Sequence, residues 1–165
     1  MSDDTEAIAE IIDNLRRVFQ VVNEKSKKAE RETGITGPQL WAIKVIGDFS
    51  SVRVSDLANR MYLNPSTVVG ILDRLAVRGI VKRSRSTIDR RVVNVELTDT
   101  GKELVNKSPQ VAQGLLVAGL EGLPFKKLKL ISFALKELVN ILGAQELPPQ
   151  LILSTEVNVP GQRKK

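Results

Sequence analysis

The stretch VSDLANRMYLNPSTVVGILDRLAVRG restricts the fold of this chain more than any other part of the sequence. Its Ser55–Asp56 pair is suited to cap a short first helix, after which the chain must turn tightly. Asn64 is a favoured N-cap and Pro65 a favoured first residue for a second helix. That helix has apolar residues at helical spacing and ends at Gly79, a typical left-handed C-cap. Two short helices joined by a tight turn predict a helix-turn-helix.

A hairpin is predicted directly after the second helix. Ile80 and Val81 lead into a turn at Ser86–Asp89. The segment Val93–Leu97 then alternates apolar and polar residues, which predicts a two-stranded wing. The order of helix, helix-turn-helix and wing predicts a winged helix-turn-helix fold, mainly α with a small β-wing. In this fold the second helix of the pair enters the major groove of DNA, and the wing lies on the flanking backbone or minor groove.

The net charge of +6 is concentrated in residues 53–91, which hold nine basic and three acidic residues. Four arginines of this segment surround the predicted wing turn: Arg83, Arg85, Arg90 and Arg91. A basic segment in an otherwise neutral chain indicates a nucleic-acid partner. Guanidinium groups on a hairpin tip also fit a narrow minor groove, for which Arg85, Arg90 and Arg91 are placed. The alternative is an exposed charged surface without a ligand. Asp89 is expected to hold either a neighbouring arginine or the wing turn.

Apolar residues at helical spacing also occur near both ends of the chain, outside the predicted winged core. In the first thirty residues they are Ile8, Ile11, Ile12, Leu15, Val18, Phe19 and Val22; near the C-terminus they are Leu128, Ile131, Leu135, Leu138 and Leu142. These stripes need a partner surface, either in a second copy of the chain or within the same one. The segment NEKSKKAERE after the first stripe is polar all round, so we expect it to fray or to cross between subunits.

The chain therefore divides into an N-terminal dimerisation helix (1–34), a winged helix-turn-helix DNA-binding domain (35–100), C-terminal dimerisation helices (101–143) and a tail (144–165). Thr36 and Gln39 are placed as a capping box for the helix that opens the winged domain. Ser108–Pro109 is expected to interrupt the helix after the wing. In the tail, the apolar Leu151–Leu153 is expected to dock on the partner subunit or on its own domain.

The composition excludes several functions. The chain has no cysteine and no histidine, so it lacks disulfides, a thiolate nucleophile, and the commonest general base and metal ligand. Without a glycine-rich phosphate loop or a carboxylate pair at a metal spacing, we predict no enzyme activity, catalytic residue, metal or cofactor. No apolar run approaches the roughly 18–20 residues of a membrane span. The acidic N-terminus does not resemble a secretion signal, so we predict a cytoplasmic protein.

The motifs around the predicted wing resemble the multiple-antibiotic-resistance regulator (MarR) family. The segment DRRVVNVELTDTG, Asp89 to Gly101, is similar to the wing pattern of that family. The segment STVVGILDRLAVRGIVKR, Ser66 to Arg83, is similar to its recognition helix and the entry to its wing. GPQLWAIKVI resembles the helix that precedes the helix-turn-helix. The resemblance covers about residues 8–142 in element order and is strongest over 54–104.

The resemblance implies a homodimeric transcriptional regulator, taken to be a repressor, whose terminal helices pair across a two-fold axis. Two recognition helices related by a dyad require a pseudo-palindromic operator with half-sites about one helical turn apart. The resemblance also implies release by a small aromatic effector bound between the dimer helices and the winged domain. Phe19, Trp41 and Met61 are the predicted lining residues, with core packing as the alternative for each. A winged domain used only for protein–protein contacts is the alternative to DNA binding.

By this resemblance Ser66 and Thr67 contact phosphates or base edges, and Arg91 enters the minor groove. Arg74 reaches the DNA backbone or pairs with Asp73 or Asp89. The chain departs from the family at Val69–Gly70, where a threonine–arginine type of pair is common. Glycine has no side chain to read a base, whereas valine could still meet a thymine methyl, so specificity would rest more on the two hydroxyls and on DNA shape. The predicted DNA-binding residues are Asn64, Ser66, Thr67, Val69, Arg74, Arg83, Arg85, Arg90 and Arg91, and the predicted wing-orienting residues are Asp73 and Asp89.

Overall fold

The computed structural model describes residues 2–152, 154 and 158, and it is mostly helical with one small antiparallel sheet. The helices are α1 (Asp3–Thr33), α2 (Gly37–Gly47), α3 (Val54–Arg60), α4 (Pro65–Val77), α5 (Asp99–Lys107), α6 (Ala112–Glu121) and α7 (Phe125–Ile141). The strands are β1 (Val52–Arg53), β2 (Val81–Arg85) and β3 (Val93–Leu97), in the spatial order β1-β3-β2. The predicted fold class, mainly α with a small β-wing, is confirmed.

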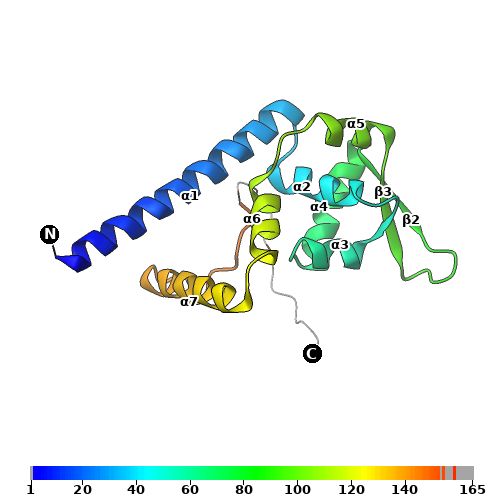
Figure 1. Cartoon of the computed structure of the whole chain (residues 1–165). Helices are drawn as coiled ribbons and strands as arrows, with labels where there is room; N and C mark the ends of the chain where they lie inside the picture. The colour runs from blue at the N-terminus through cyan, green and yellow to red at the C-terminus, as the bar shows by residue number, and fades with distance from the viewer. Residues whose placement is uncertain (1, 153, 155–157, 159–165) are drawn as a thin grey trace.

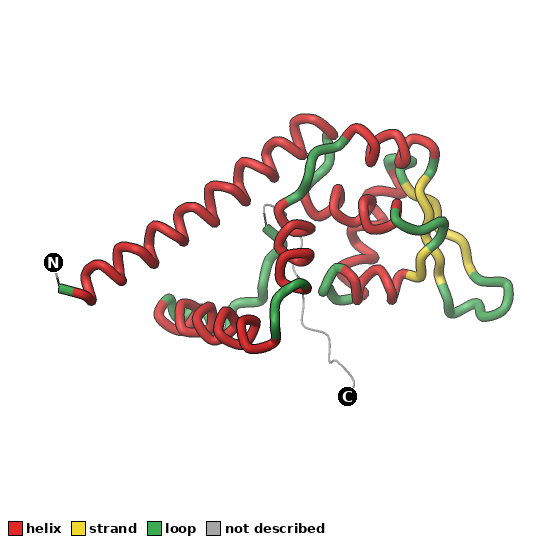
Figure 2. Tube along the Cα trace, in the orientation of Figure 1, coloured by secondary structure: helices red, strands yellow, loops and turns green. Residues whose placement is uncertain are grey.

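The molecule consists of a winged domain and terminal helices that project from it (Figure 1). Helices α2 to α5 gather around the base of the sheet, and the loop between β2 and β3 extends beyond them at one end (Figure 2). Toward the opposite end α1 runs outward, and α7 lies apart from the winged domain. Among the described residues, no helix combines the length and the apolar character that a membrane span needs.

Helix α2 lies at the centre of the hydrophobic core. Eight of its residues are buried, because its apolar side chains point in all directions. Leu40 of this helix shares one core cluster with Leu57 of α3 and Leu72 of α4, and none of the three has exposed surface. The capping box predicted for α2 is confirmed: Gln39 N donates to Thr36 Oγ1 at 3.4 Å, and Thr36 N donates to Gln39 Oε1 at 3.2 Å.

The helix cap predicted at Ser55–Asp56 is wrong. Helix α3 begins at Val54, with Arg53 instead of Ser55 at the N-cap position and no side-chain capping bond. The reason is strand β1, which the sequence pattern did not reveal and which places Val52 opposite Val95 of β3. Pairing with β3 already holds the chain extended up to the start of α3, so the entry into the helix is fixed without a side-chain cap.

The prediction that the second half of α1 frays is wrong for this chain, whereas its alternative, that this half crosses between subunits, stays a prediction. The helix continues to Thr33 and ends at Gly34, whose φ of 69° lies in the left-handed region. Ser26 and Ala29 are buried, and α1 packs against α2 and α6. These side chains are small enough to let two helices approach closely, a contact that a stripe of large apolar residues does not indicate.

The helix interruption predicted at Ser108–Pro109 is confirmed. Helix α5 ends at Lys107, and α6 starts only after Ser108–Pro109. Helix α6 forms despite its glycines because it packs on the core: a Cβ at Gly114 would lie 3.4 Å from Cδ1 of Trp41. Helix α7 is followed by Gly143 at a left-handed φ of 65°.

Candidate nucleic-acid interface

Helix α4, the second helix of the pair, has one buried and one exposed face. Its buried apolar residues are Val68, Ile71, Leu72 and Leu75. Ser66 and Val69 are exposed, and a Cβ at Gly70 would meet no atom within 4 Å, so the outer surface of the helix is open there. Asn64 and Pro65 occupy the N-cap and the first turn as predicted, although Asn64 makes no side-chain capping bond.

The wing is formed by β2 and β3, which pair along their full length with Arg85 opposite Val93. In the connecting loop, Asp89 Oδ1 accepts a hydrogen bond from Arg91 N at 2.9 Å. Asp89 therefore fixes the wing turn, one of the two roles considered for it. Arg85, Arg90 and Arg91 are exposed beside or within this turn.

The fourth wing arginine, Arg83, connects the wing to α4. Its Nη2 donates to Asp73 Oδ1 at 2.6 Å and to the carbonyl oxygen of Val69 at 3.3 Å. Such charge-assisted bonds are short and directional, so they hold β2 and α4 in a fixed relative orientation. Asp73 thus has the wing-orienting geometry that was predicted, through Arg83 rather than through its neighbour Arg74. The guanidinium of Arg83 is engaged within the protein.

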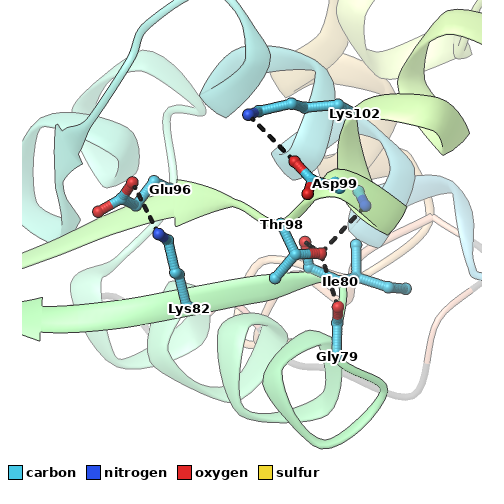
Figure 3. A network of polar contacts seen from close by, with 8 residues as sticks. Gly79, Ile80, Lys82, Glu96, Thr98, Asp99 and Lys102 are labelled. Atoms are coloured by element: carbon cyan, nitrogen blue, oxygen red, sulfur yellow. Dashed lines mark hydrogen bonds and ion pairs between the residues drawn. The ribbon is translucent and has the colours of Figure 1, made fainter.

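A threonine at the base of the wing, Thr98, joins the wing to the neighbouring helices (Figure 3). The sequence pattern did not indicate this role. Thr98 Oγ1 donates to the carbonyl oxygen of Gly79 at 2.7 Å and accepts from Gly101 N at 3.1 Å. Thr98 N donates to the carbonyl oxygen of Ile80 at 3.1 Å. One residue therefore joins the end of α4, the start of β2 and the first turn of α5.

The turn between α3 and α4 is held by a contact that lies far away in the sequence. Tyr62 adopts a positive φ of 53°, and its Oη donates to Glu121 Oε1 at 2.9 Å. This hydrogen bond and the negative charge of Glu121 raise the pKa of the Tyr62 phenol above its ordinary value. The helix-turn-helix is thereby connected to the end of α6.

The N-terminus of α4 is in contact with the C-terminal tail. Asn158 Oδ1 accepts from Asn64 N at 3.0 Å and from Thr67 Oγ1 at 3.4 Å. Thr67, a predicted DNA contact, is only 7% exposed, whereas the neighbouring Ser66 is exposed. The two hydroxyls predicted to act together are therefore in different environments.

Arg74 and the predicted effector residues lie at separate places. Arg74 borders a cavity of about 470 Å³ beside the start of α2, and Trp41, Met61 and Phe19 are not among its lining residues. Trp41 and Met61 are core residues, whereas Phe19 on α1 is 70% exposed. The three do not share one environment within the chain, so effector binding stays a prediction.

The predicted dimer residues lie on the surface of the single chain. Those that are exposed are Ile8, Ile11, Ile12, Ile131 and Leu135, and those that are partly buried are Leu15, Leu128 and Leu138. None of the 17 residues of α7, all of which the structure describes, is buried. Grouped apolar residues of this kind are typical of protein–protein interfaces.

Comparison with known proteins identifies relatives of this arrangement. Residues 35–93 match the MarR family. The chain is 33% identical over 88 residues to the HTH-type transcriptional repressor MdtR of Bacillus subtilis, a match that covers 53% of this chain and 57% of MdtR. The chain thus spans little more than half the length of that relative.

Solved structures match a larger share of the chain. A MepR-like protein complexed with pseudoligands is 25% identical with a TM-score of 0.54, over 87% of this chain and all of that one. A mutant of the MarR protein from E. coli, complexed with operator DNA, is 23% identical with a TM-score of 0.52, over 79% of this chain and 96% of that one. These likenesses confirm the predicted winged helix-turn-helix fold.

Proposed function

We propose that this chain, whose residues 35–93 match the MarR family of winged helix-turn-helix transcriptional regulators, binds double-stranded DNA as a homodimer. Proteins of this family are transcription regulators and not enzymes. A dimer with two recognition helices would read a pseudo-palindromic operator, one half-site for each helix. MdtR is named a repressor, which favours repression over activation for this chain as well.

The observation that carries the proposal is the connection between α4 and a wing bearing exposed arginines. Arg83 binds Asp73 and thereby joins the two parts, while Arg85, Arg90 and Arg91 remain exposed on the wing. A helix that enters the major groove and a cationic hairpin beside it must keep a fixed spacing to contact one duplex simultaneously. The bond between Arg83 and Asp73 would keep α4 and the wing at such a spacing in the DNA-free protein.

We assign distinct roles to the exposed residues of the interface. Ser66 and Val69 lie on the open face of α4. There Ser66 would contact a phosphate or a base edge, and Val69 would contact a thymine methyl. Arg90 and Arg91 would enter the minor groove or bind its phosphates. Arg83 would act through the position of the wing. Release by a small aromatic effector stays a prediction.

The rival function, a winged domain used only for protein contacts, differs in its response to salt. We expect fluorescence anisotropy with a random duplex to show a Kd that rises at least about tenfold between about 50 and about 200 mM salt, as neutralisation of two or more phosphates requires. A surface evolved for protein contacts has no reason to release DNA counterions. A chain that binds no duplex at low salt, or whose Kd does not respond to salt, would contradict the proposal.

A substitution at the wing tip tests whether Arg91 contacts DNA. We expect Arg91→Ala to raise the Kd at least about tenfold, because one charge-assisted contact is lost in each subunit. Its free energy of unfolding should stay within about 0.5 kcal/mol of the wild type, since the side chain is exposed. Arg16→Ala removes the same charge from an exposed site on α1 and should leave the Kd unchanged. Equal affinities of the two variants would remove Arg91 from the interface.

A further inference from the structure

The chain after α7 returns to the DNA-facing helix. In Figure 1 the segment that follows α7, drawn in orange, turns back from the end of α7 toward α6. Leu151 packs against the hydrophobic core, and Ser154 borders the same cavity as Arg74. Asn158 then reaches the first residues of α4, and its own backbone N donates to the carbonyl oxygen of Pro149 at 2.9 Å. Among the described residues of the tail, Leu151 thus contacts the core and Asn158 contacts both Pro149 and the recognition helix.

The contact that Asn158 makes is the kind that a DNA phosphate makes. The first N–H groups of a helix have no partner within the helix, and they attract phosphate oxygens. Here one such group, Asn64 N, donates to the amide oxygen of Asn158 at 3.0 Å, and the Thr67 hydroxyl donates to the same oxygen at 3.4 Å. A single acceptor atom thus collects two donors that lie at the entrance of the major-groove helix.

From this geometry we propose that the C-terminal tail is an autoinhibitory element that occupies the phosphate site at the N-terminus of α4. The inference rests on the proposed DNA binding and adds its regulation. A phosphate oxygen and the amide oxygen of Asn158 cannot accept from Asn64 N and Thr67 Oγ1 at the same time. DNA must therefore displace the tail, and the apparent affinity falls in proportion to the fraction of molecules whose tail is open.

The strength of the contact between Asn158 and α4 depends on the chemistry of its acceptor atom. An asparagine oxygen is a neutral acceptor, and charged acceptors form shorter and stronger hydrogen bonds to the same donors. A DNA phosphate held in place by the wing arginines would therefore displace the amide oxygen of Asn158 from these donors. A single isolated phosphate contact would compete less well. The tail thus lowers the affinity less for a duplex that contacts α4 and the wing together than for a duplex that contacts α4 alone.

The test uses the full-length protein and a random duplex at low salt. Asn158→Ala should lower the Kd about three- to tenfold, because a net stabilisation of this size is typical of one or two hydrogen bonds. Asn158→Asp should raise the Kd, since a carboxylate binds the helix N-terminus more tightly and repels phosphate. Asn106→Ala, at an exposed position of α5, is the matched control and should bind as the wild type does. All of these variants keep the basic residues at the chain end.

A second measurement examines the contact without DNA. Hydrogen exchange at the Asn64 amide should be faster in Asn158→Ala than in the wild type, while circular dichroism shows that the variant stays folded. Unchanged exchange would show that the tail does not bind α4, and faster exchange with an unchanged Kd would show that the contact does not inhibit; either result overturns the inference while the proposed function stands. If neither wild type nor Asn158→Ala binds any duplex, the proposed function itself has failed.

Discussion

Replacing Ile12 of α1 by aspartate is expected to convert the proposed dimer to a monomer and to raise the Kd for duplex DNA more than about 100-fold. Ile12 is 41% exposed in the single chain and lies on the same stripe as Ile8 and Ile11. A carboxylate placed in an apolar interface loses its hydration without gaining a partner, which opposes association. The DNA effect follows because two half-site contacts linked in one dimer bind far more tightly than either contact alone.

The α7 side of the interface gives an independent variant, Leu135→Asp, because Leu135 is 53% exposed on a helix without a buried residue. Light scattering after size exclusion should give twice 18.2 kDa for the wild type and 18.2 kDa for both variants. Asn14→Asp adds the same charge to α1 beside Arg17, with which Asn14 already bonds, and should remain a dimer. A monomeric wild type, or two dimeric variants, would contradict the proposed assembly.

The sequence predicted those parts of the fold that local signals determine. Asn64–Pro65 at the start of α4, Gly79 after its end and the Thr36 capping box each act through residues within one helical turn. The wing was predicted in the same way, since the alternation of apolar and polar residues and a polar turn are local patterns. The basic segment was visible from composition, and the family match agrees with the motif around Asp89.

The parts that the sequence did not reveal depend on contacts between distant segments. Strand β1 has two residues, too few for any alternation, and it exists because β3 lies beside it. The bond between Arg83 and Asp73 spans ten positions and forms only because β2 returns along α4. The bond from Asn64 to Asn158 spans 94 positions, and no local pattern marks Asn158 as a partner of α4.

The same reasoning explains the uneven outcome for the candidate site. Exposure of Ser66, Arg90 and Arg91 follows from their places on a helix face and a turn, so the sequence could indicate it. The burial of Thr67 could not be predicted, because helical periodicity leaves it at the edge of the apolar face and a remote segment bonds its hydroxyl. Residues that the tail contacts therefore differ from their neighbours for a reason outside the motif.

Substituting Gly101 by alanine is expected to destabilise the protein by about 3 kcal/mol, the upper range for forcing extra atoms into a packed site. A Cβ at this position would lie 2.2 Å from the carbonyl oxygen of Ile80, a backbone atom that cannot rotate away. The same oxygen accepts from Thr98 N at 3.1 Å, so any shift that relieves the clash also weakens the bond at the base of the wing. The glycine of the LTDTG motif is thus required by close approach of α5 to the start of β2.

Thermal unfolding followed by circular dichroism measures this effect, and a loss of about 3 kcal/mol corresponds to a midpoint roughly 6–12 °C lower for a chain of this size. Gly70→Ala is the matched control, because a Cβ there meets no atom within 4 Å and alanine favours the helix by about 0.5–1 kcal/mol. The two glycine-to-alanine changes should therefore shift the midpoint in opposite directions. If Gly101→Ala unfolds at the wild-type temperature, α5 does not pack on Ile80 as described, and the wing cannot owe its fixed position to the Thr98 junction.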